Sequence, residues 1–207
     1  MKNRSALRCR STLPAAALLS CCLTAACTDV ASAGEPANGC DPQQARAFDF
    51  WIGEWDIDQR ILGSDGSWIE LPASTLVEPV LDGSALLERW QGNVQFFWRG
   101  MTAPEPMTGF SFRACNARDD RWYIHWADSL TPGVGRPYAG TFANGRGVFF
   151  RESAAEGRLE RITFADITVD SVCWALAVSN DGGRTWTDVW TMAMHRRAGP
   201  RRSVAGD

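Results

Sequence analysis

Acidic residues share strand faces with tryptophans at three places in the chain, and this spacing is its best candidate for chemistry. In an extended segment, residues two positions apart project from the same face, and each of these acids lies an even number of positions from a tryptophan. A carboxylate on an apolar face is desolvated, so it must be paired or its pKa must shift. We therefore expect one aromatic-lined pocket in which the carboxylates anchor a ligand. The predicted ligand-binding residues are Glu88, Trp90, Trp126, Asp128, Asp188, Trp190 and Met192.

Two other interpretations of the acids stay open. They could form structural ion pairs at the rim of the domain, with Arg89 and Arg161 as partners, or act as general acids or bases. The rest of the chain offers little catalytic machinery, because Lys2 is the only lysine and two histidines are too few for a three-histidine zinc site. Nucleophile-elbow, H-E-x-x-H and phosphate-loop motifs are all missing from the sequence. We predict no catalytic residue, no metal and no cofactor.

The segments that must position these side chains alternate in polarity with a period of two from Trp55 onward. Turn signals rich in Gly, Asn and Asp separate them at roughly 8–15 residues, as in antiparallel hairpins. An open sheet of so many apolar strands would leave aggregation-prone edges, which favours closure. We predict an all-β fold, a closed antiparallel up-and-down barrel of about 8–10 strands with a short N-terminal helix. The segments expected to be extended are 54–62, 67–80, 84–92, 94–99, 107–115, 121–128, 136–143, 147–153, 158–168, 171–179 and 184–195.

A short helix is predicted over residues 42–52. Asp41 is a good N-cap, Pro42 suits the first helical position, and Gly53 stops the helix. Apolar residues recur at helical spacing toward its end, so we expect it to lie against the core.

Four segments carry a resemblance to a known family. They read FDFWIGEWD from Phe48, GSALLERW from Gly83, WYIHWAD from Trp122 and SNDGGRTW from Ser179. In this order they resemble the lipocalin-like family catalogued as domain of unknown function 1579, over residues 46–195. The resemblance implies a lipocalin or calycin-like barrel in which Trp55 packs across the closed end, and it implies no established activity.

The chain departs from that family at two places. Leu176-Ala177 replaces a Trp-Glu pair, and Met192 or Met194 replaces a tyrosine, so any role of the family's side chains there is not carried over. The SNDGGRTW segment also fits the Asp-box pattern of sialidase-like propellers. A propeller repeats its unit, and the single clear copy favours a plain hairpin with Asp181 and Gly183 as turn residues.

The N-terminus resembles an export signal, with basic residues before an apolar run over 13–26. Cleavage after Ala33 gives a signal peptide of 1–33, whereas an imperfect lipobox ending at Cys27 gives a signal of 1–26 and a lipidated Cys27. Residues 34–40 are the predicted linker, 41–196 the barrel and 197–207 a basic, flexible, solvated tail that begins next to Arg196. We expect a periplasmic or extracellular protein, membrane-anchored if it is a lipoprotein.

Charge and cysteine content fit that location. Loss of residues 1–33 removes four of 21 basic residues but one of 24 acidic residues, so the net charge changes from −3 to −6. Nucleic-acid binding needs a cationic face and is therefore not expected. An oxidising compartment permits one disulfide among Cys40, Cys115 and Cys173, with the pairing open.

Three functions compete at this level. A hollow barrel would bind a small, partly apolar molecule in an aromatic cavity. A filled barrel would be a structural or interaction domain without such a cavity. An enzyme would place two carboxylates within reach of one point. We favour the binder, then the filled barrel, then the enzyme.

Overall fold

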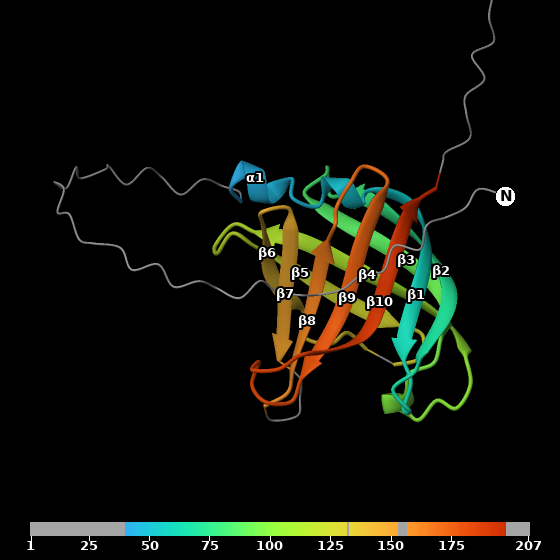
Figure 1. Ribbon diagram of the computed structural model, residues 1–207. Helices are drawn as coiled ribbons and strands as arrows, with labels where there is room; N and C mark the ends of the chain where they lie inside the picture. Colours follow the sequence, from blue (N-terminus) through green and yellow to red (C-terminus); the bar gives the residue numbers. More distant parts are fainter. Residues whose placement is uncertain (1–39, 132, 153–156, 198–207) are drawn as a thin grey trace, which may run out of the picture.

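Ten antiparallel strands form one closed barrel in the computed structural model, which describes residues 40–131, 133–152 and 157–197 (Figure 1). Each strand pairs with the next, and β1 pairs with β10 to close the sheet. The all-β up-and-down prediction is therefore confirmed. The elements are α1 (Pro42–Ala45), η1 (Asp49–Trp51), β1 (Gly53–Leu62), β2 (Trp68–Val80), β3 (Ala85–Val94), η2 (Phe97–Arg99), β4 (Glu105–Asn116), β5 (Arg121–Asp128), β6 (Tyr138–Ala143), β7 (Arg146–Glu152), β8 (Leu159–Ala165), β9 (Ser171–Ser179) and β10 (Thr187–Arg196).

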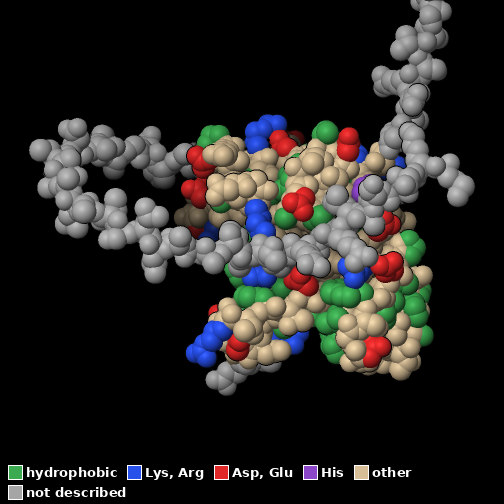
Figure 2. Space-filling model, in the orientation of Figure 1, with side chains coloured by type: hydrophobic (Ala, Val, Ile, Leu, Met, Phe, Trp, Pro, Cys, Tyr) green, Lys and Arg blue, Asp and Glu red, His purple; other side chains and the backbone are tan. Residues whose placement is uncertain are grey.

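The predicted signal peptide, Cys27, the linker to residue 39 and the tail from residue 198 lie outside the described residues. Within the described part, no helix is long and apolar enough to cross a membrane. On the face drawn in Figure 2, arginine and acidic side chains are interspersed over the barrel.

The N-terminal helix is shorter than predicted. Asp41 caps α1 as expected, accepting hydrogen bonds from the backbone N–H groups of Gln43 (2.9 Å) and Gln44 (3.3 Å). The α-helix then ends at Ala45, and after a turn the chain forms the 3-10 helix η1, so the single 42–52 helix was wrong. The break turns Phe48 and Trp51 into the barrel, where both are buried. The helical spacing of the apolar residues alone does not predict this change in the direction of the chain.

Segment 94–99 is not a strand. Val94 ends β3, and the apolar run that follows folds into η2, which Gly100 terminates in a left-handed conformation. This loop lies at the end of the barrel opposite α1 (Figure 1). Phe96 is buried against Trp190, with ring centroids 5.1 Å apart, whereas the next two aromatic residues are substantially exposed. Within the apolar run that follows β3, Phe96 is the residue that packs into this end of the barrel.

Trp55 closes the α1 end of the barrel. The side chain is fully buried, and its indole N–H donates to the Trp51 carbonyl at 2.8 Å. The guanidinium of Arg196 lies over the indole ring at 4.2 Å from the centroid and donates to the carbonyls of Ile52 (2.6 Å) and Phe50 (2.7 Å). The last strand thus holds the segment that enters the first strand.

The basic run at Arg196-Arg197 was expected to be solvated, but Arg196 is partly buried against Trp55. Arg197 is about half exposed and forms ion pairs with Glu54 at 3.0 Å and with Asp56 at 2.6 Å on β1. The backbone conformation requires glycine at position 53, where φ is +123°. A Cβ there would also lie 2.6 Å from the Arg196 Nη1.

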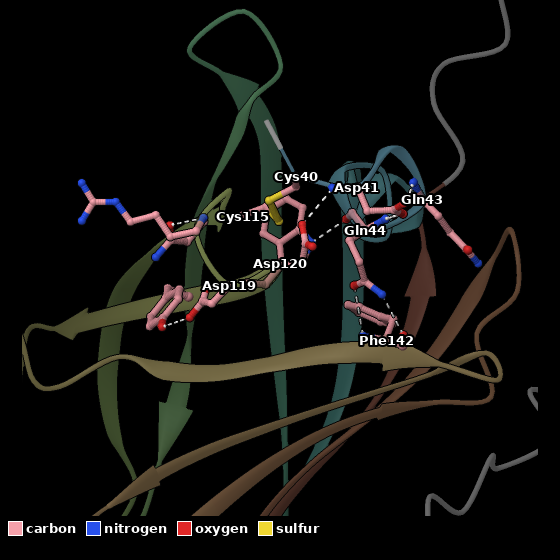
Figure 3. Close-up of a disulfide and its surroundings, with 12 residues drawn as sticks. Cys40, Asp41, Gln43, Gln44, Cys115, Asp119, Asp120 and Phe142 are labelled. Atoms are coloured by element: carbon pink, nitrogen blue, oxygen red, sulfur yellow. Dashed lines mark hydrogen bonds between the residues drawn. A yellow bond between two sulfur atoms is a disulfide. The ribbon is translucent and has the colours of Figure 1, made fainter. Parts of the chain in front are cut away.

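A disulfide between Cys40 and Cys115 ties the start of the domain to the end of β4 (Figure 3). Beside it, the Asp41 backbone N–H donates to the Asp120 carboxylate at 2.9 Å, and the Gln44 amide donates to the Phe142 carbonyl at 3.1 Å. The bond joins residues 75 positions apart. A cross-link of this span restricts the unfolded chain and typically stabilises the fold by about 2–4 kcal/mol.

Candidate functional site

A cavity of about 170 Å³ lies inside the barrel, with a wall formed by side chains from β3 to β10 together with the two 3-10 helices and residues beside η2. Most of this wall is aromatic or aliphatic. It includes six of the seven side chains singled out from the sequence, namely Glu88, Trp90, Trp126, Asp128, Trp190 and Met192. The period of two along the strands correctly indicated that these acids and rings share the interior.

Asp188 does not line the cavity, so the parity argument was wrong for this residue. The register of β10 against β9 shifts by one residue between Asp188 and Trp190, as at a β-bulge. Trp190 lies opposite Leu176, which lines the cavity, whereas Asp188 lies opposite Ala177, which does not. Asp188 acts instead on Arg161: burial lowers the pKa of that guanidinium, and the Asp188 charge partly opposes the shift.

Tryptophans meet edge to face across the cavity. The Trp90 ring lies 6.4 Å from that of Trp126 and 5.7 Å from that of Trp190, and Trp174 lies 5.4 Å from Trp190. Gly109 on β4 makes this arrangement possible, because a Cβ there would lie 2.3 Å from the Trp126 Cζ2. The edge-to-face geometry fixes the rings, so the aromatic wall is a defined surface.

Glu88 is held in a buried polar cluster. Its carboxylate forms an ion pair with Arg113 and accepts hydrogen bonds from Thr75 (3.0 Å) and Ser111 (2.8 Å). Both charged side chains are almost completely buried. Burial lowers the pKa of Arg113, and the charge of Glu88 partly opposes this. Arg89, a candidate partner from the sequence, pairs instead with Glu78, and both side chains are about half exposed.

Sequence reasoning missed Arg113. It stands opposite Ile124 on β5, so it shares the inner face, but nothing local to β4 reveals that an arginine there has a carboxylate across the sheet. Its guanidinium also lies 4.9 Å from the Phe48 ring centroid and 5.4 Å from that of Trp51. Arg113 therefore joins the floor of the cavity to the closed end.

Asp128 stands at the opposite, open end of the cavity. Its carboxylate accepts two hydrogen bonds from Arg99, both at 3.3 Å, and one from the Trp126 indole at 3.0 Å. The backbone N–H groups of Leu130 and Thr131 donate to it at 3.0 and 2.8 Å. Burial raises its pKa, but the hydrogen bonds from Arg99 and Trp126 outweigh burial and hold the pKa below its usual range.

Protonation of Asp128 at low pH should lower the stability of the barrel. Because the folded-state pKa lies below the unfolded value of about 3.9, the carboxylate stabilises the fold above that pH and loses this effect as the pH falls through the folded pKa. We expect wild type to be more stable than Asp128→Asn at pH 7, with the gap narrowing below about pH 4. Urea unfolding of both proteins from pH 7 to pH 3 measures it. A gap that stays constant over this range would contradict the assignment.

A third polar cluster spans β6, β7 and β8. The Tyr138 hydroxyl donates to Glu160 at 2.6 Å, and Arg151 pairs with the same carboxylate through its Nε (3.1 Å) while lying over the Tyr138 ring. Burial, and next the charge of Glu160, raise the pKa of Tyr138 well above its usual range. These three side chains line the cavity as cross-strand neighbours and were also missed, since only strand register places them together.

The hairpin from Ser179 to Trp186 is a turn, as predicted. The Asp181 carboxylate accepts hydrogen bonds from the backbone N–H groups of Arg184 (3.0 Å) and Thr185 (2.9 Å), and Gly183 has φ +91°. Hydrogen bonds from Thr185, and next from Ser179, hold the pKa of Asp181 well below its usual range. Asp181 is not among the residues that line the cavity.

Comparison with known proteins adds information about the fold. Neither a family model nor a curated protein matches the sequence. Rv2717c from M. tuberculosis matches in structure with a TM-score of 0.50 and 12% identity, over 77% of this chain and 99% of that one. The fold is calycin-like. The S-type phycobiliprotein lyase CPES from Guillardia theta is similar over 74% of this chain and 92% of its own, with a TM-score of 0.48 and 12% identity. At such identity a structural match shows the fold alone.

Proposed function

We propose that this barrel binds one small, partly apolar molecule in its interior. The observation that carries the proposal is the cavity itself: about 170 Å³ of space between tryptophans that are locked edge to face. Cavities of about 150 Å³ lined by apolar side chains bind benzene. The space therefore suits a molecule with at least one aromatic ring, and this favours the binder over the filled barrel.

The enzyme hypothesis has less support. An enzyme that uses cavity carboxylates needs one that is free to take or give a proton near the substrate. In the described structure each of the three lining carboxylates is instead engaged by an arginine: Glu88 by Arg113, Asp128 by Arg99 and Glu160 by Arg151. These acids are better suited to holding the wall in place than to proton transfer.

Trp126→Ala should weaken binding by removing one face of the cavity. We expect a hydrophobic naphthyl dye to bind wild type and to lose about tenfold in affinity in the variant, as loss of a large aromatic contact implies. Isothermal titration calorimetry measures both constants. Trp68→Ala is the matched control, because Trp68 lies on β2 beside Arg60 and is not among the residues that line the cavity. It should bind like wild type. Equal binding by wild type and Trp126→Ala, or binding by neither, would favour a filled barrel.

Export is the second part of the proposal. Two features support it: the N-terminal segment resembles an export signal, and the Cys40–Cys115 bond suits an oxidising compartment. Membership of the domain of unknown function 1579 family is also part of the proposal, and the segments beginning at Phe48, Gly83, Trp122 and Ser179 support it. We expect the exported chain to begin at Gly34, or at a lipid-bearing Cys27. N-terminal sequencing with mass measurement distinguishes these two forms, and an intact Met1 on exported protein would contradict both.

A further inference from the structure

We infer that the cavity selects an uncharged molecule, and that it discriminates against the carboxylate or ammonium analogue of the same molecule. The inference rests on the proposed binding function and names the chemical class of its ligand. It follows from the balance of charges in the cavity wall.

The charges of the wall cancel in pairs. The described cavity wall holds three carboxylates and three guanidiniums, and every carboxylate is paired with a guanidinium. The pairs are Glu88 with Arg113, Asp128 with Arg99 and Glu160 with Arg151. An ionised ligand entering this space would lose its water and find no counter-charge that is not already taken. A neutral ligand carries no such penalty.

A carboxylate bound by Arg113 is the strongest competing interpretation. Arg113 is already neutralised by Glu88 at contact distance, so a second carboxylate would leave the buried site with a net negative charge. Removal of the Glu88 charge should therefore reverse the preference. Glu88→Gln frees the charge of Arg113 and should turn the cavity toward anions.

Calorimetry with three matched probes tests the discrimination against charged ligands on the disulfide-intact mature protein. The probes are 2-acetylnaphthalene, 2-naphthoate and 2-naphthylmethylammonium. We expect wild type to bind the ketone at least about tenfold more tightly than either ion. In Glu88→Gln, the affinity for naphthoate relative to the ketone should rise by at least about tenfold. Asp128→Asn, which frees Arg99 at the open end, should shift the same ratio in the same direction and serves if Glu88→Gln does not fold.

Wild-type protein that binds naphthoate as tightly as the ketone would overturn the discrimination against charged ligands, but it would agree with the proposed binding function. If wild type binds none of the probes, the proposed function fails and the inference fails with it.

Discussion

Trp55→Ala is expected to lower the free energy of unfolding by about 3–5 kcal/mol, as truncation of a large aromatic residue in a core does. The indole is fully buried and stacks on Trp51, with centroids 5.7 Å apart. It also provides the surface on which the Arg196 guanidinium lies. Since Arg196 donates to the Phe50 and Ile52 carbonyls, we expect loss of the ring also to weaken the contact between the end of β10 and the segment that enters β1.

Urea unfolding of wild type and Trp55→Ala measures this loss. Trp98→Ala is the matched control, because that side chain is 38% exposed on the loop at the opposite end. It should change stability by less than about 1 kcal/mol. A change below about 1 kcal/mol in Trp55→Ala as well would show that the closed end does not hold the barrel.

Breaking the Glu88–Arg113 pair should have an equally large effect. Arg113→Met leaves a buried carboxylate without its charged partner, and Glu88→Gln leaves a buried guanidinium, so each should lower the free energy of unfolding by about 3–5 kcal/mol. The double variant Glu88→Gln/Arg113→Met leaves no unpaired charge at this site and should be more stable than either single variant. A double-mutant cycle followed by urea unfolding measures the coupling.

The outer surface offers a matched control for this cycle. Glu78 and Arg89 form the same kind of pair on β2 and β3, but both side chains are about half exposed. Glu78→Gln should therefore change stability by less than about 1 kcal/mol. Equal effects at the buried and exposed pairs would contradict the view that the cavity floor is a desolvated ion pair.

Strand periodicity predicted the parts of this barrel that depend on local pattern. The alternation around Trp90 and Trp126 placed Glu88 and Asp128 on the cavity wall correctly, because a regular strand keeps its parity. The same rule failed for Asp188, since a single register shift beside Trp190 reverses the parity. It failed again at 94–99, where an apolar run is a loop that inserts Phe96 into the barrel mouth.

The charge pairs of the cavity could not be predicted in this way. Arg113 and Glu88 lie 25 positions apart, and their contact depends on how β3 and β4 align. Arg151 and Glu160 meet for the same reason, as direct partners in the register of β7 and β8. A single sequence does not state the register, so it indicates which face a charge occupies but not which charge neutralises it.

Native mass spectrometry of the purified protein tests the central claim most directly. We expect a species that carries one small molecule per chain, and its loss in Leu176→Trp, where a larger side chain fills the cavity between β8 and β10. Incubation with 2-acetylnaphthalene should likewise give a one-to-one adduct with wild type and none with Leu176→Trp. The bare chain alone under all these conditions, or adducts equally abundant in both proteins, would contradict a ligand site inside the barrel.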